Sequence, residues 1–294
     1  MRRLTILLAA IASLVLMRAV GSSAQRRTTP APPQRIVSLV PATTEMLYVM
    51  GAGSRLVGVG SYDRYPPDVE KLPRLGGLLD PSVERLIALR PDLVIVYDSQ
   101  TDLRRQLERA RLPAWGYSLK GLPDITSTMR ALGERIGMAA QGKAAAANIE
   151  AQLRAIQSRV AGRPRPRTLL VFGREPGSLR GINASGGYGF LHDLLEVAGG
   201  TDVLSDIKQA TVSMSSEMVL GRAPEVIIEV HYGDSLKNTQ LDTERRVWDT
   251  LRAVPAVRTR RVYLLAGDEF VVPGPRVVQA ADRFARALHP GPLR

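Results

Sequence analysis

The sequence predicts an α/β protein of two lobes, each built on a mostly parallel sheet, joined by one long rigid α-helix. Strands and helices alternate along residues 34–140, and the alternation resumes along residues 163–294. This alternation is typical of a parallel sheet with helices on both faces. The segment between the two stretches has the residue pattern of a single helix.

Residues 141–162 are expected to form the connecting helix. They are rich in Ala, and four apolar residues lie at the spacing of one helix face. These four are Ile149, Leu153, Ile156 and Val160. Gly142 is expected to open the helix and Gly162 to end it, because Gly and Pro interrupt helices and Pro follows Gly162 closely. The roughly 19 residues between these two glycines span about 28 Å at about 1.5 Å per residue, close to the diameter of a small domain.

The first lobe begins with an apolar strand that stops at Pro41 and runs into Thr43 and Thr44, residue types that favour helix starts. Short apolar runs bounded by Gly, Pro or charged residues predict the other strands. The expected strands are 36–40, 56–59, 93–96 and 114–117. The expected helices are 43–50, 85–89, 103–110 and 125–136.

The second lobe repeats this alternation after the connecting helix. Its expected strands are 168–172, 226–230 and 261–265. Its expected helices are 190–198, 217–220 and 277–288. The Gly-rich segment 181–189 lacks the Lys-Ser/Thr of a phosphate-binding loop and is interpreted as a mobile loop at the cleft edge.

An internal repeat relates the two lobes. Residues 82–96 and 215–229 both contain Ser-x-Glu, a short helix, Pro, an acid and an apolar strand, with an offset of 133 residues. Glu84 and Glu217 therefore open helices in corresponding places. A carboxylate is favourable at a helix N-terminus, so capping alone could explain either glutamate. Its recurrence indicates a shared plan for the two lobes.

The N-terminus is interpreted as a targeting segment. Arg2 and Arg3 precede the apolar run 4–17, and small residues lead to Ala24, which predicts a signal peptide over residues 1–24 cleaved near Ala24. An uncleaved anchor is the alternative, but about 14 apolar residues are short of the ~20 that span a bilayer. Residues 25–33 are expected to form a disordered leader. The chain has no Cys, which excludes disulfides and a lipid-bearing cysteine, so we expect a periplasmic protein.

The formal net charge of +12 does not indicate a nucleic-acid partner. The arginines are scattered, and no basic patch with interleaved aromatic residues stands out. No group of His, Asp and Glu has the spacing of a metal site, so neither a metal nor a cofactor is expected. His192 is expected to bond with its neighbours, and His289 to lie at the frayed end of the last helix.

Three motifs carry a resemblance to a known family. They are residues 35–45 with 51–53, residues 86–94, and residues 190–200. Together the motifs resemble the periplasmic substrate-binding proteins of ABC importers for cobalamin, haem and ferric siderophores, over residues 35 to about 290. The resemblance implies two Rossmann-like lobes joined by a long helix, a monomer without enzyme activity, and an ABC permease/ATPase complex as partner.

The loop 61–67 is similar to the corresponding loop of cobalamin-binding members. The resemblance implies that Tyr62 lies against a corrinoid ligand, with Tyr65 beside it, and that the late loop 268–272 supplies further contacts. The implied contacts from that loop are Asp268, Glu269, Phe270, Val271 and Val272. An ordinary packed loop aromatic is the alternative for either tyrosine. His231 follows the strand 226–230, at a strand end where α/β proteins hold ligands, and is a candidate contact or axial ligand.

Other ligands and functions stay open. Haem would use Tyr62, Tyr65 or His231 as axial ligand, and a ferric siderophore would use Arg174 and Arg180 as cations. Members that bind cobalamin can carry Trp where this chain has Gly77, Leu78, Leu79 and Glu269. A non-transport adaptor with the same fold is a further alternative. A serine hydrolase of Ser185, His231 and Asp268 lacks the Gly-x-Ser-x-Gly motif.

The resemblance also implies a docking role for the repeated glutamates. In the family a Glu at the tip of each lobe faces an Arg pocket on one of two permease subunits. Glu84 and Glu217 occupy these places in the present sequence. A charge-assisted pair at each end fixes the orientation of a binding protein on a two-fold symmetric transporter.

Overall fold

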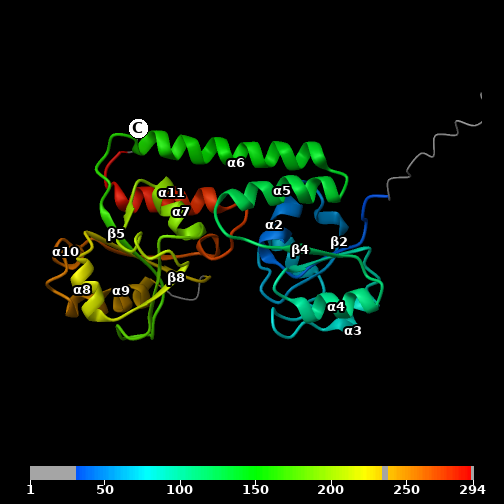
Figure 1. Ribbon diagram of the computed structural model, residues 1–294, viewed down its shortest axis with the longest axis horizontal. Helices are drawn as coiled ribbons and strands as arrows, with labels where there is room; N and C mark the ends of the chain where they lie inside the picture. The colour runs from blue at the N-terminus through cyan, green and yellow to red at the C-terminus, as the bar shows by residue number, and fades with distance from the viewer. Residues whose placement is uncertain (1–30, 234–237, 293–294) are drawn as a thin grey trace, which may run out of the picture. The chain divides into compact units, whose positions relative to one another are not determined.

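The computed structural model describes residues 31–233 and 238–292 (Figure 1). The predicted signal peptide, residues 1–24, and most of the predicted leader lie outside the described residues. From Pro33 onward the chain forms one compact unit. Within the described ranges, no helix combines the length and apolar character that a membrane span requires.

The first lobe contains a four-stranded parallel sheet in the order β2-β1-β3-β4. Its strands are β1 (Ile36–Ser38), β2 (Leu56–Val59), β3 (Leu93–Tyr97) and β4 (Ala114–Tyr117). Its helices are α2 (Pro41–Val49), α3 (Val83–Ala88), α4 (Thr101–Arg109) and α5 (Pro123–Arg135), with the 3-10 turns Gly53–Arg55 and Pro67–Lys71. Each predicted strand and helix of this lobe is confirmed to within a few residues.

The two faces of this sheet bury alternate residues of its central strands. Ile36 and Ile95 contribute to the core shared with α2 and α5. Val37 and Val94 contribute to the core shared with α3 and α4. Successive side chains of a strand point to opposite faces, so an apolar run such as residues 93–96 indicates a strand covered on both sides.

The second lobe contains a six-stranded sheet in the order β10-β9-β5-β6-β8, with β7 also paired to β5. The strands are β5 (Arg167–Gly173), β6 (Ile182–Ser185), β7 (Thr201–Asp202), β8 (Thr211–Met214), β9 (Val226–His231) and β10 (Val262–Ala266). The pairs β5·β7, β5·β9 and β9·β10 are parallel, whereas β6 is antiparallel to both β5 and β8. The helices are α7 (Phe190–Val197), α8 (Ser216–Arg222), α9 (Asn238–Val247), α10 (Pro255–Arg258) and α11 (Val277–Leu288), with the 3-10 turns Trp248–Thr250 and Asp268–Phe270.

The Gly-rich segment 181–189 is not the mobile loop that the sequence suggested. Residues 182–185 form strand β6, which is paired on both sides. Ile182 and Ala184 are buried in the core of the lobe, and this alternation fixes the strand. Four residues among glycines are too few for the alternation to be visible in the sequence.

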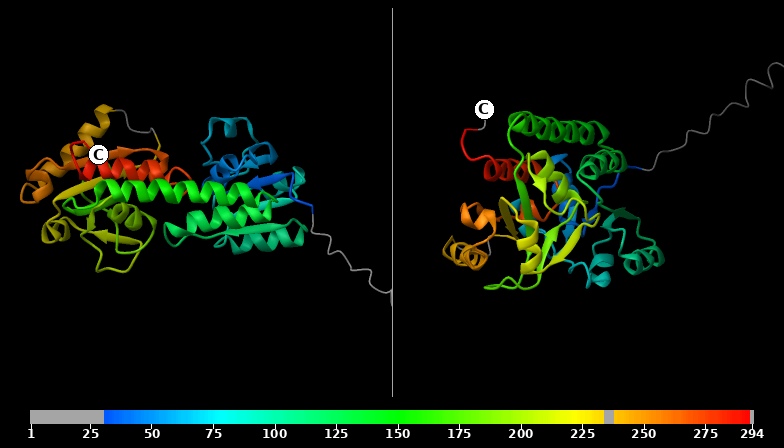
Figure 2. Two further views of the ribbon diagram at one scale, coloured as in Figure 1. Left: turned by 90° about the horizontal axis from the view of Figure 1, so that it is seen from above. Right: turned by 60° about the vertical axis from the view of Figure 1, so that its left-hand side comes forward.

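Helix α6 (Ala139–Val160) connects the lobes, packing on α5 of the first lobe and on α11 of the second (Figures 1 and 2). The predicted apolar stripe is confirmed, because Ile149, Leu153, Ile156 and Val160 are all buried. The predicted start at Gly142 is wrong. A Cβ at Gly142 would lie 2.7 Å from the carbonyl oxygen of Met129, so this glycine permits the close crossing of α5 and α6.

Two histidines make polar contacts within the second lobe. His192 Nδ1 lies 3.0 Å from Asp202 Oδ2, which confirms that its neighbours satisfy it. His289 is buried at the end of α11, and its Nε2 lies 3.2 Å from the carbonyl oxygen of Ala198. The predicted frayed end is therefore wrong for His289, because the ring joins α11 to the end of α7.

Candidate ligand-binding cleft

A cavity of about 250 Å³ lies between the lobes and is lined from both sides. From the first lobe it takes residues that follow β1 and β2 and the last residue of β3, and from the second lobe residues that follow β9 and the turn after β10. The residues that line it include Leu39, Gly60, Tyr62, Tyr97, Tyr232, Val271 and Val272. Carboxyl ends of parallel strands are where open α/β sheets bind ligands.

A second cavity of about 350 Å³ adjoins the first, since Val271 lines both. Its walls include Phe172, Tyr188 and Phe190 from the second lobe and Lys120 from the first. Sites for small molecules generally measure about 300–1,000 Å³. The first cavity is smaller than this range and the second lies near its lower limit, so a macrocyclic ligand requires both or a wider separation of the lobes.

Tyr62 and Tyr65 occupy different environments. The side chain of Tyr62 lines the first cavity, and the residue is 59% exposed. The ring of Tyr65 lies outside both cavities, with the guanidinium of Arg276 4.3 Å from its centroid. Tyr65 thus packs as a loop aromatic against the second lobe. Tyr232, which the sequence did not single out, donates to the carbonyl oxygen of Tyr62 at 3.5 Å from across the cleft.

The side chains of the late loop 268–272 are divided between the cleft and the protein interior. Val271 and Val272 line the first cavity. Phe270 lines the second cavity but is fully buried, with its ring stacked 5.3 Å from that of Phe284. The carboxylate of Glu269 is buried and accepts a hydrogen bond from Arg283. Asp268 lines neither cavity, and its Oδ1 is buried without a hydrogen-bond partner among the residues that the structure describes.

His231 belongs to a buried polar network rather than to the cavity walls. Its Nε2 lies 3.0 Å from the carboxylate of Glu229, which also accepts from Trp248 Nε1 at 2.7 Å and from Arg174. Burial would raise the pKa of Glu229, but the nearby His231 ring, the hydrogen bond from Trp248 and the charge of Arg174 lower it. The Arg174 side chain is buried between Glu229 and Glu244, so it is not the free cleft cation considered for an anionic siderophore.

Other candidate residues lie away from ligand chemistry. Arg180 is exposed and paired with Glu175. Ser185 is fully buried in β6 and donates to the carbonyl oxygen of Gly186, which excludes it as a nucleophile. Across residues 31–233 and 238–292, no group of three or more acidic or His side chains could hold a metal ion.

A buried ion pair crosses between the lobes. Arg276 donates to Glu45 through both Nε, at 3.0 Å, and Nη2, at 2.5 Å. Burial raises the pKa of Glu45 although Arg276 lowers it, and the hydrogen bond and charge of Glu45 raise the pKa of Arg276 against the effect of burial. Nearby, Tyr117 of the first lobe donates to the carbonyl oxygen of Pro273 at 3.3 Å. Sequence reasoning missed this pair because 231 positions separate its partners.

Asp63 is an unusual acid beside Tyr62. It is almost fully buried, and neither carboxylate oxygen has a hydrogen-bond partner within the described chain. Burial raises the pKa of Asp63 to about 7. Its position between two tyrosines of one loop was the only signal of it in the sequence.

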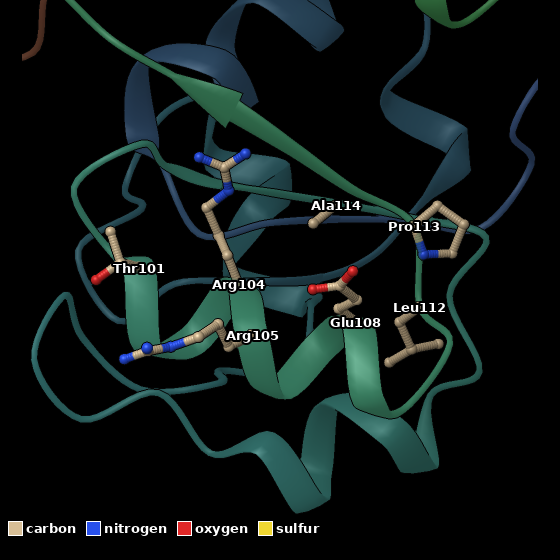
Figure 3. Close-up of a pocket in the computed structure, with 7 residues that line it drawn as sticks. All are labelled: Thr101, Arg104, Arg105, Glu108, Leu112, Pro113 and Ala114. Carbon is tan, nitrogen blue, oxygen red and sulfur yellow. The ribbon is translucent and has the colours of Figure 1, made fainter.

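A hollow of about 530 Å³ on the first lobe shares no residue with the cleft (Figure 3). It lies beside α4, and its arginines are already paired, Arg104 with Asp98 and Arg105 with Asp102. Because these charges are satisfied locally, the hollow carries no candidate ligand chemistry.

Glu84 and Glu217 are exposed in the first turns of α3 and α8. These helices lie on the side of their lobes opposite α6 (Figure 1). In both, a serine hydroxyl accepts a backbone N–H of the first turn, so neither glutamate is needed as the N-cap. Both carboxylates are left on the surface.

Comparisons with known proteins agree with this architecture. The family model described as periplasmic binding protein matches residues 36–269. A vitamin B12-binding protein of Pectobacterium atrosepticum is 28% identical over 87% of this chain and 88% of its own. Two solved structures, each 24% identical and covering 88% of this chain, show the same fold. They are the periplasmic vitamin B12 binding protein of Vibrio cholerae (TM-score 0.74, 98% of that chain) and a periplasmic heme binding protein of Pseudomonas aeruginosa (TM-score 0.75, 94% of that chain).

Proposed function

Because the chain belongs to the periplasmic binding protein family, we propose that it captures cobalamin between its lobes and delivers it to an ABC importer. Membership places it among substrate-binding proteins and not among enzymes. Vitamin B12-binding proteins at 27–28% identity to this chain support a corrinoid as ligand. We further propose that residues 1–24 export the chain to the periplasm, where it acts as a monomer.

One observation carries the ligand proposal: the exposed ring of Tyr62 faces a cavity whose opposite wall is Val271 and Val272. A planar macrocycle gains most by burying its faces against flat aromatic and aliphatic surfaces. Phe172 and Phe190 extend this apolar wall into the second cavity. Tyr62, Val271 and Val272 are therefore the proposed ligand contacts, and Phe270 lines the adjoining cavity; Tyr65, Asp268, Glu269 and His231 lie outside the walls of both cavities.

Haem is the second candidate, favoured by one observation. The phenol of Tyr62 is exposed at the cavity and could ligate ferric iron. The two ligands make opposite demands on this residue. Cobalamin requires its ring, whereas haem ligation requires its hydroxyl oxygen.

The test is a calorimetric titration of residues 25–294 with cyanocobalamin, haemin and a ferric hydroxamate. We expect binding of cyanocobalamin, weakened about tenfold or more by Tyr62→Ala, since an aromatic contact of this size contributes ~1.5–3 kcal/mol. Tyr62→Phe is the matched variant and should retain binding. Loss of a haem Soret band in Tyr62→Phe, with no binding of cyanocobalamin, would establish haem instead.

For delivery we propose that Glu84 and Glu217 pair with cationic side chains on two permease subunits. Their exposure on the same side of the molecule supports this role. Glu84→Ala and Glu217→Ala should lower uptake while leaving ligand affinity intact. A tenfold loss of affinity in calorimetry for either variant would contradict the docking role.

A further inference from the structure

The helices that carry the two glutamates are built alike. Ser82 caps α3 by accepting the N–H of Arg85, and Ser215 caps α8 by accepting the N–H of Met218. In both helices the glutamate is the second residue, and the residue two positions after the glutamate is apolar. We refer to α3 and α8 as the tip helices.

The far ends of the tip helices are also held by equivalent contacts. In each lobe an arginine at the start of a strand donates from its side chain to a carbonyl oxygen at the end of the tip helix. The backbone N–H of the same arginine donates to an acidic side chain that lies just before a neighbouring strand. The contacts are Arg35 to Leu89 (2.7 Å) and to Asp92 (2.8 Å), and Arg167 to Arg222 (2.8 Å) and to Glu225 (2.9 Å). Both tips are therefore fixed surfaces rather than free loops.

Three residues beyond each glutamate the tip helices expose an aliphatic side chain. Ile87 is 45% exposed and Leu220 is 40% exposed, and the same offset of 133 residues relates them. The residue before each, Leu86 or Val219, is fully buried and anchors its helix. Residues at i and i+3 are neighbours on a helix surface, so each tip presents a carboxylate next to an aliphatic group.

A single exposed aliphatic residue is ordinary, but its recurrence beside the same acid in both lobes needs a cause. An exposed ion pair alone contributes little, because water screens it and two long side chains must be ordered. Apolar groups around a charged contact exclude water and strengthen it. An aliphatic neighbour is thus what a docking glutamate requires.

We propose that each tip docks as a two-part contact, Glu84 with Ile87 and Glu217 with Leu220, on a symmetric permease dimer. Each copy of the partner would present a cationic side chain and an adjoining apolar hollow. Equivalent surfaces on two lobes fit equivalent sites on two copies of one subunit. This inference rests on the delivery step of the proposed function but not on the identity of the ligand.

The first test is photo-crosslinking in living cells of the source organism. p-Benzoylphenylalanine is placed at position 87 or 220, and at position 49 as control, because Val49 is equally aliphatic and 53% exposed outside the tip helices. We expect positions 87 and 220 to crosslink to the same membrane-embedded permease subunit and position 49 to give no such product. Crosslinks from 87 and 220 to unrelated proteins, or to none, would overturn the inference.

The second test measures docking of the full mature chain to that permease/ATPase complex in nanodiscs. Ile87→Ser and Leu220→Ser should each weaken docking about tenfold, the loss expected for an aliphatic side chain that becomes buried. Val49→Ser should dock as the unaltered chain does. If both tip variants also docked normally while Glu84→Ala and Glu217→Ala failed, the glutamates would act alone and the two-part contact would be wrong. Calorimetry with cyanocobalamin judges the ligand proposal separately.

Discussion

Replacing Arg276 by Gln removes the cation from the ion pair that joins the two lobes. The Glu45 side chain is 3% exposed and the Arg276 side chain 13% exposed, so water reaches neither freely. Arg276→Gln leaves the Glu45 carboxylate buried without its partner. Removing one member of a buried pair generally costs about 3–5 kcal/mol, and the residual exposure of Arg276 favours the lower end of this range.

Replacing Glu45 by Gln, instead of Arg276, should destabilise the protein less. In Glu45→Gln the guanidinium of Arg276 keeps Glu269, whose Oε2 lies 3.9 Å from Nη1, and it keeps the Tyr65 ring. We expect Glu45→Gln to lower the free energy of unfolding by about 1–2 kcal/mol. The asymmetry follows from the environment of each charge, because Glu45 has one cationic partner and Arg276 has two acidic ones.

Differential scanning calorimetry at pH 7.5 measures both variants and the double variant. About 3 kcal/mol corresponds to a fall in Tm of roughly 6–12 °C for a domain of this size. Because burial raises the pKa of Glu45 and Arg276 no longer lowers it, protonation of the unpaired carboxyl as the pH falls should relieve part of the loss in Arg276→Gln, and the double variant isolates the coupling. Equal losses for the two single variants, or a loss under about 0.5 kcal/mol for Arg276→Gln, would refute this reasoning.

Two further predictions concern buried positions. Because the pKa of Asp63 is raised to about 7 in the folded chain, the fold holds a proton that the unfolded chain releases near pH 3.8. The free energy of unfolding should therefore fall as pH rises from about 4 to 7, by about 4 kcal/mol for a pKa change of this size. Asp63→Asn should flatten this pH dependence in denaturant titrations at pH 4, 6 and 8. Gly142→Ala should lower the free energy of unfolding by about 1–3 kcal/mol, because the new Cβ would meet the carbonyl oxygen of Met129. Gly221→Ala should raise it by about 0.5–1 kcal/mol, because a Cβ there meets nothing within 4 Å. Equal effects of the two glycine substitutions on Tm, or an unchanged pH slope in Asp63→Asn, would contradict these predictions.

The sequence predicted those parts of the fold that depend on local patterns. The apolar stripe of α6 and the four strands of the first lobe are periodic runs, and each is where the periodicity placed it. Strands β6 and β8 were missed because their four residues mix apolar with polar types and form no apolar run, so their conformation depends on the strands they pair with. Gly142 was misread because a glycine inside a helix is explained only by the neighbouring helix that approaches it.

The cleft was predictable only where a motif marked it. Tyr62, Val271 and Val272 lie in loops that the resemblance singled out, and all three line the cavity. Tyr97 and Tyr232 come from strand ends without a distinctive motif, in the sheets of different lobes, and only the packing of the two lobes brings them to the same cavity. The ion pairs of Glu269 and Arg174 depend on partners distant in the chain, so no local pattern shows that these charges are already satisfied.

The arrangement of contacts also indicates how a ligand could leave. Helix α6 lies on one side of the lobes, and the tip helices lie on the other (Figure 1). An uninterrupted helix packed on both lobes resists large hinge motion, so separation of the lobes must strain the side that faces the tips. That separation breaks the pair Glu45–Arg276 and the contact of Tyr232 with Tyr62, which hold the cleft together. We infer that these contacts keep the lobes closed in the free protein and that the docking proposed above, at tips on the side away from α6, would separate the lobes.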